Sequence, residues 1–353
     1  MRYIIDKKGV DLLKLKTLPA VETLASDITI TNEALAYKNF PVASVELTDA
    51  QVALLKSKNI SCTQEIVGKG EGIGGLLILD NQYEKTRTGY TQLKNQRNNS
   101  AALIKVAFLD TGRRPELAYE FGYNFIDNNT NVAESLYHGT ATSSVVKGII
   151  PATGYEIGLA NDCELHILKI IGANGAINES ALIAAYDYCV THQIDFANCS
   201  LAAYINNHQT YLNALKAANC VLVCASGNSL YPGGGDSSVV QPAALNYAIA
   251  VNAQREDLSI KFNSVFGGHG IDFAASGDEQ EAIHPINLGV YYPGGTSLSA
   301  PFITGSLAVL ACKLRKIDPV LWADNYKVVE YAKQHAILRG DRKYFGFGNF
   351  NHL

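Results

Sequence analysis

The feature that most constrains the fold of this chain is a repeated alternation of short apolar strands with helical segments beyond residue 100. Each strand is apolar over nearly its whole length, unlike a strand that has one face in water. Such strands, separated by helices of about 10 to 15 residues, are typical of a parallel sheet covered on both faces. The predicted strands are 104–109, 164–171, 194–199, 221–225 and 248–251, and the predicted helices begin at His138 and span 180–191 and 207–218. The sequence therefore predicts an α/β fold with a mainly parallel central sheet.

Residues 1–67 follow a different pattern and are predicted to form a separate small α+β domain. Thr48, followed three residues later by Gln51, is a capping box that marks the start of a helix. The order strand, helix, two strands, helix, strand is that of a ferredoxin-like unit. The expected strands are 2–6, 28–31, 40–47 and 60–66, and the expected helices are 10–26 and 52–58.

A glycine-rich segment follows this unit. Five of the eight residues in 68–75 are glycine, which favours no regular element. We therefore predict that 68–80 is a linker and that 81–353 form a second, larger domain.

Charge and composition exclude several classes of protein. With 29 basic and 33 acidic residues, the net charge is −4, so we expect no nucleic-acid partner. The longest apolar runs are shorter than the roughly 20 residues that a bilayer span requires, so no membrane partner is expected. Residues 1–16 mix charged with apolar side chains, which is unlike a signal peptide. We expect a cytoplasmic location, or secretion if an upstream leader is removed.

The seven cysteines are odd in number and scattered, and several lie in apolar stretches. A chain of this size is stable without disulfides, so these cysteines are predicted to be buried free thiols. The sequence contains neither a Cys-x-x-Cys nor a His-Glu-x-x-His motif, and we predict no metal site and no cofactor.

Three polar segments lie at the ends of apolar runs, where the sites of open α/β sheets gather. Asp110 follows a predicted strand, His138 opens a helix, and Ser297 follows two glycines before an apolar helix. Taken singly, such residues are more often a turn former, a surface or core histidine, and an ordinary serine near a helix N-terminus. The segments read Asp110-Thr111-Gly112, His138-Gly139-Thr140 and Gly295-Thr296-Ser297-Leu298-Ser299-Ala300-Pro301.

In this order, the three segments resemble the signatures of the subtilisin-like serine peptidases. An α/β-hydrolase has its serine first, in a Gly-x-Ser-x-Gly elbow, and a chymotrypsin-like enzyme has its histidine first, so both are excluded. The resemblance implies a subtilisin-like three-layer fold and a serine endopeptidase. Ser297 is then the nucleophile, His138 the general base and acid, and Asp110 the residue that orients the imidazole.

The same resemblance implies further site residues. The apolar strand ending in Ala225-Ser226-Gly227-Asn228 implies that Asn228 donates to the tetrahedral oxygen. Two further segments imply edges on either side of an extended substrate. Together with Gly227, the substrate-binding residues so implied are Gly175, Ala176, Ile177, Ser200, Leu201 and Ala202. In the family, glycines stand where this chain has Ala202 and Ala203. We therefore expect a narrower pocket for the substrate residue that precedes the scissile bond.

Two other segments bear on the comparison with the family. Residues 148–156, which lie where many members bind a structural calcium ion, contain a single carboxylate, so we expect no calcium site. Residues 344–350 resemble the closing strand of the family.

The N-terminal unit resembles the family's propeptide, which implies an intramolecular inhibitor. We predict a zymogen that cuts itself between Val67 and Asp80, with the segment after Ile66 lying between 175–177 and 200–202. The expected partners are thus a peptide or protein substrate and the chain's own prodomain. Two alternatives stay open: a maturation protease or transpeptidase for one peptide or protein partner, and a non-catalytic subtilase fold used for binding. The presence of the triad residues and Asn228 argues against the second.

Overall fold

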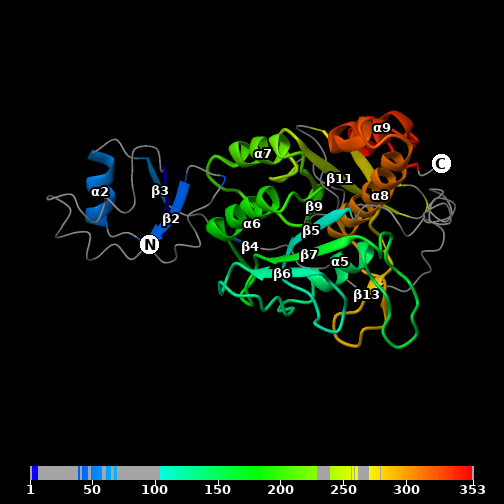
Figure 1. The fold of residues 1–353 in the computed structure, drawn as a ribbon, viewed down its shortest axis with the longest axis horizontal. Coiled ribbons are helices and arrows are strands. Elements are labelled where there is room, and N and C mark those ends of the chain that lie inside the picture. Colours follow the sequence, from blue (N-terminus) through cyan, green and yellow to red (C-terminus); the bar gives the residue numbers. More distant parts are fainter. Residues whose placement is uncertain are drawn as a thin grey trace.

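The computed structural model describes residues 2–6, 39, 42–46, 49–57, 61–64, 67–69, 104–228, 239–255, 257, 259–260, 270–278 and 280–351. Its centre is a seven-stranded sheet in the order β12-β11-β10-β9-β5-β7-β6 (Figure 1). All neighbouring pairs in this sheet are parallel, which confirms the predicted fold class. The strands are β5 (Lys105–Asp110), β6 (Phe121–Asn124), β7 (Glu164–Lys169), β9 (Phe196–Cys199), β10 (Val221–Ala225), β11 (Ala248–Gln254) and β12 (Phe273–Ser276).

The sheet separates two apolar cores, and alternate residues of each strand enter different cores. In β5, Val106 and Phe108 lie in one core, whereas Ala107 and Leu109 lie in the other. Every residue of β9, β10 and β11 is buried, as is every residue of β5 after Lys105. This explains why the strands read as continuous apolar runs in the sequence.

Helices cover both faces of the sheet (Figure 1). The first core contains residues of α5 (Gly139–Val146), α8 (Thr296–Ile317) and α9 (Asn325–His335). The second contains residues of α6 (Glu179–Thr191) and α7 (His208–Ala217). The short elements η2 (Leu321–Ala323), β13 (Ala282–Ile283) and β14 (Val290–Tyr291) complete this part of the chain.

Among the described helices, only α8 is long and apolar enough to cross a membrane. Its most apolar window has a mean hydropathy of 1.4, yet 94% of that window is buried inside the protein. Helix α8 is thus the core helix on its face of the sheet.

The N-terminal part contains a three-stranded antiparallel sheet in the order β2-β1-β3. Its elements are β1 (Arg2–Asp6), β2 (Val42–Glu46), α2 (Asp49–Ser57) and β3 (Cys62–Gln64). Helix α2 begins directly after the Thr48 of the capping box, three residues earlier than the predicted helix 52–58. The predicted helix 10–26 and strand 28–31 lie outside the described residues, so the ferredoxin-like topology and the domain limits stay predictions.

The segment predicted as a linker begins with ordered structure. Gly68 and Lys69 belong to strand β4 (Val67–Lys69), which pairs antiparallel with β8 (Ala176–Asn178). Pairing through main-chain groups needs no particular side chain, so a glycine-containing segment can form a strand when a free sheet edge is available. Glycine content alone therefore does not exclude a strand at this position, and the linker limits 68–80 stay a prediction.

The chain's end also differs from the sequence-based prediction. Residues 344–350 were expected to form a strand, but helix α10 (Arg342–Phe345) includes the first two of them. The side chain of Asp341 accepts a hydrogen bond from Lys343 N at 2.8 Å, which starts a helical turn. Gly346, with φ of +60°, ends that turn, and the remaining segment forms one isolated bridge between Asn349 and Ile337.

Candidate active site

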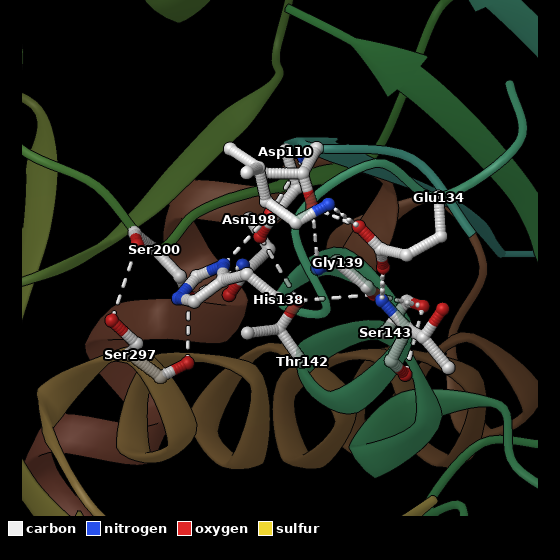
Figure 2. Close-up of polar contacts among 12 residues, drawn as sticks. Asp110, Glu134, His138, Gly139, Thr142, Ser143, Asn198, Ser200 and Ser297 are labelled. Atoms are coloured by element: carbon white, nitrogen blue, oxygen red, sulfur yellow. Dashed lines mark hydrogen bonds and ion pairs between the residues drawn. The ribbon is translucent and has the colours of Figure 1, made fainter. Parts of the chain in front are cut away.

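The site lies where the winding of the sheet reverses. From β5, the chain adds β7 on one side and β9 on the other, so β5 and β9 flank the switch point. Ligand sites of open parallel sheets lie outside the carboxyl ends of the strands at such a point. Asp110 is the last residue of β5 and Ser200 directly follows β9. The topology thus brings together the predicted residues, which are far apart in the sequence (Figure 2).

Asp110 and His138 form a buried pair. The Nδ1 atom of His138 lies 2.7 Å from Oδ1 of Asp110, and the two side chains are 7% and 2% exposed. Thr111 N donates to Oδ1 of Asp110 at 2.7 Å, and Thr142 Oγ1 donates to Oδ2 at 3.0 Å. Because these donors satisfy the carboxylate and burial excludes water, Asp110 is held as an acceptor that faces one ring nitrogen of His138.

Ser297 is the second residue of helix α8 and lies at the far side of the His138 ring from Asp110 (Figure 2). Its Oγ donates to Ser200 O at 3.2 Å, and Ser200 Oγ donates to Ser297 O at 2.8 Å. Gly295, at the N-cap of α8, has a φ of +130°, a conformation that glycine adopts without strain. The tight turn and these two bonds place the hydroxyl at the positive end of a 22-residue helix.

Asn228 lies beside the same helix start. Its Oδ1 accepts a hydrogen bond from Thr296 N at 3.1 Å. A Cβ atom built on Gly295 would lie 3.6 Å from Nδ2 of Asn228, so the side-chain amide packs against the turn that precedes Ser297. The amide oxygen of Asn228 thus accepts a hydrogen bond, and its nitrogen lies beside the turn that precedes Ser297.

The residues predicted to form the two substrate edges lie in and before β8 on one side and directly after β9 on the other. Ala176 and Ile177 are in β8, directly after Gly175, whose φ is +74°. On the other side, Ser200 and Leu201 follow β9 and are buried, while Ala202 is partly exposed. Ala203, expected to narrow the pocket together with Ala202, is only 2% exposed and belongs to the core beneath the sheet. Its methyl group packs inward, so Ala202 is the member of the pair that reaches the surface.

The structure adds residues that sequence reasoning missed. Thr142 bonds to Asp110, and Glu134 bonds to Thr111 and to the backbone of α5. Thr142 carried a weak signal, since it is a polar residue one helical turn after His138 and thus on the same face. Glu134 carried none, because its bonds depend on how two loops meet in three dimensions.

The thiol and metal predictions can be compared with the described residues. All seven cysteines are buried and free, which confirms the prediction of buried thiols. Burial raises the pKa of Cys163 to about 12. In the ranges that the structure covers, no three His, Cys, Asp or Glu side chains form a group that could hold a metal ion.

Comparison with known proteins agrees with this geometry. Residues 89–348 match the model of the subtilase family. The chain is 27% identical over 259 residues to subtilisin Savinase of Lederbergia lenta, covering 70% of this chain and 88% of that protein. The chain is also 27% identical over 259 residues to an alkaline protease of Alkalihalobacillus alcalophilus, and the match covers 63% of that protein. Subtilisin NAT of Bacillus subtilis subsp. natto is 26% identical over 275 residues, which cover 74% of this chain and 69% of that protein.

The match to the subtilase family and the similarity to subtilisins define the class of this protein as a serine endopeptidase, a hydrolase of peptide bonds. The family match covers well over half of the sequence, and the chain therefore belongs to the subtilase family.

Proposed function

We propose that Asp110, His138 and Ser297 form the catalytic triad of this serine endopeptidase. His138 takes the proton of the Ser297 hydroxyl as Oγ attacks the peptide carbonyl, and Asp110 stabilises the imidazolium that forms. The imidazolium then gives the proton to the leaving amine, which leaves an acyl-enzyme on Ser297. A water molecule, deprotonated by His138, hydrolyses this ester and restores the serine.

The negative oxygen of each tetrahedral intermediate needs donors already in place. The Nδ2 group of Asn228 and the backbone N–H of Ser297 supply them, and the dipole of α8 adds to the stabilisation. Because Thr296 N holds the Asn228 oxygen at 3.1 Å, the amide does not have to reorient when charge develops.

The observation that carries this proposal is the buried 2.7 Å contact between His138 Nδ1 and Asp110, with the ring turned toward Ser297 (Figure 2). Ser297→Ala tests it by removing one oxygen atom. The variant is expected to lose hydrolysis of peptides and reaction with a fluorophosphonate probe, and to keep its melting temperature. Ser299→Ala is a matched control, because this buried hydroxyl on the same helix has no hydrogen-bond partner among the described residues. If Ser297→Ala retains more than a few per cent of the activity, Ser297 is not the nucleophile.

We also propose that the chain is a zymogen whose N-terminal part inhibits the site. Strand β4 supports this, because Val67, Gly68 and Lys69 pair antiparallel with Asn178, Ile177 and Ala176, the edge expected to bind substrate. An added strand is a general mode of peptide recognition. The predicted cut between Val67 and Asp80 then lies just beyond a segment held as substrate would be held.

Contacts outside the substrate edge support the same arrangement. Asn39 N donates to Asp187 Oδ1 at 2.6 Å, and its side chain donates to Thr191 Oγ1 at 2.7 Å, both on α6. Asn206, which precedes α7, donates to Gln64 O at 3.1 Å. The N-terminal part therefore has contacts that persist if the chain is cut after β4.

Incubation of the purified chain followed by mass spectrometry and gel filtration tests the zymogen. Two fragments are expected that elute together, with the cut between Val67 and Asp80, while Ser297→Ala stays whole. Equal cutting of both chains would show processing by another protease. A chain that stays intact while hydrolysing peptides would make residues 1–67 a permanent accessory domain.

A further inference from the structure

The start of helix α5, which directly follows His138, lacks a capping hydrogen bond from its own N-cap residue. His138 is the N-cap residue of α5, but its side chain is bonded to Asp110 and makes no capping hydrogen bond. The first N–H groups of a helix lack partners within the helix, and a buried helix start needs them satisfied. Gly139 and Thr140, the first two residues of α5, are both buried.

Two side chains from elsewhere supply the missing acceptors. Thr111 Oγ1 accepts from Gly139 N at 2.8 Å, and Glu134 Oε2 accepts from Thr140 N at 2.6 Å. The hydroxyl of Thr111 donates in turn to Oε1 of Glu134. A closed set of hydrogen bonds therefore joins the end of β5, the loop before His138 and the start of α5.

Each bond in this set lies one or two residues from a triad member. Thr111 directly follows Asp110, and Gly139 directly follows His138. The backbone after Asp110 also contacts the backbone after His138, because a Cβ atom built on Gly139 would lie 2.1 Å from Gly112 O. Glu134 itself lies on the side of His138 away from Ser297 (Figure 2). It thus contacts the framework of the pair and not the atoms that react.

We propose that Glu134 is a positioning residue that sets the geometry of the Asp110 and His138 pair. This inference rests on the triad proposed above. The carboxylate bonds to both partners' segments: to Thr111 after Asp110 and to Thr140 after His138. Its negative charge also matches the positive end of α5. Without it, the start of α5 can shift relative to β5, and the imidazole moves with it.

Glu134→Ala is expected to lower kcat by about tenfold to a hundredfold, since small misplacements of catalytic groups have effects of this size. KM is expected to stay nearly constant, because Glu134 does not touch the substrate edges. Activity is normalised to active sites titrated with a fluorophosphonate, so that loss of folded protein is not counted. Glu116→Gln is the control: Glu116 is exposed in the same region and pairs with Arg114 at 2.7 Å.

Thr111 gives a second, milder pair of variants. Thr111→Ser keeps the hydroxyl and is expected to keep kcat near the wild-type value, whereas Thr111→Val removes both bonds and is expected to resemble Glu134→Ala. If Glu134→Ala folds poorly, the comparison of Thr111→Ser with Thr111→Val still tests whether these hydrogen bonds position the pair. Equal kcat values for the serine and valine variants would overturn the proposal.

A spectroscopic readout separates positioning from simple helix capping. The proton between His138 Nδ1 and Asp110 gives a downfield proton NMR resonance, which can be recorded in the inactive Ser297→Ala background. Loss or a large shift of this resonance is expected with Glu134→Ala and not with Glu116→Gln. A lower melting temperature with unchanged resonance and unchanged kcat per active site would show that Glu134 only stabilises the helix. Because this test needs no turnover, it is independent of whether Ser297 is the nucleophile.

Discussion

At the scale of single residues, Asn228 uses the two ends of one amide differently. The oxygen accepts from Thr296 N, and the proposed task of the nitrogen is to donate to the substrate oxygen only when that oxygen becomes negative. Asn228→Ala is therefore expected to lower kcat by about 10²–10³-fold, the general effect of removing one oxyanion donor, with little change in KM. Steady-state kinetics on a peptide substrate measures both constants. A rise in KM at constant kcat would instead assign Asn228 to substrate binding.

His208 makes the stability of the protein depend on pH. Burial lowers its pKa to about 4, and its Nε2 lies 2.9 Å from the Tyr186 hydroxyl. The unfolded chain binds a proton near pH 6.5, but the folded chain does so only near pH 4. The stabilisation is thus fully present above pH 6.5 and is lost as the pH falls toward 4, by roughly 3 kcal/mol.

Replacing His208 by glutamine removes the titrating group and retains an acceptor for Tyr186. We expect His208→Gln to lose less free energy of unfolding between pH 6.5 and pH 4 than the parent chain. Urea unfolding at several pH values, in the Ser297→Ala background to prevent autolysis, measures this difference. The exposed His335→Gln serves as control. Parallel curves for the His208→Gln and parent chains would show that another group controls acid unfolding.

At the scale of elements, the pairing of β4 with β8 is the contact on which the zymogen proposal depends most. Along an antiparallel strand, the N–H groups of successive residues point alternately toward and away from the partner. Replacing both Gly68 and Lys69 by proline therefore removes a donor facing β8, whichever residue supplies it. The double variant is expected to cut itself more slowly than the parent chain.

A time course by mass spectrometry measures this rate. The comparison variant has proline in place of both Asp6 of β1 and Val42 of β2. These changes damage the N-terminal sheet and leave β4 unchanged. If the Gly68 and Lys69 double variant is cut at the parent rate and position, the pairing does not guide processing.

At the scale of the whole molecule, we expect stability without a bound metal. Gly148 O accepts from Ile157 N and Gly158 N, both at 2.9 Å, and Asn161 Oδ1 accepts from Gly148 N at 2.9 Å. These two oxygens are thus used by protein donors, whereas calcium needs six to eight oxygen ligands. Addition of EDTA is expected to leave the melting temperature unchanged relative to EDTA saturated with calcium. A lower melting temperature with EDTA alone would reveal a site that our prediction missed.

Sequence alone determined the fold class and the three segments that carry Asp110, His138 and Ser297. Strands buried on both faces must be apolar throughout, so their positions can be read directly from the composition of short runs. It did not predict β6, β12 or α9, and it predicted a closing strand where α10 begins. Phe121 of β6 is 51% exposed at the edge of the sheet, so this strand lacks the continuous apolar signal.

Tertiary structure alone decided how the site is held together. Thr111 and Glu134 are 23 residues apart, and Asn198 and Thr304 are 106 apart, yet each pair is joined by a side-chain hydrogen bond. The pairing of β4 with β8 likewise joins segments about a hundred residues apart through main-chain atoms that every residue possesses. Local sequence encodes which residues are buried and where helices start, because both depend on neighbouring residues. Contacts between distant polar groups depend on where the packed sheet places them, and no local pattern contains that information.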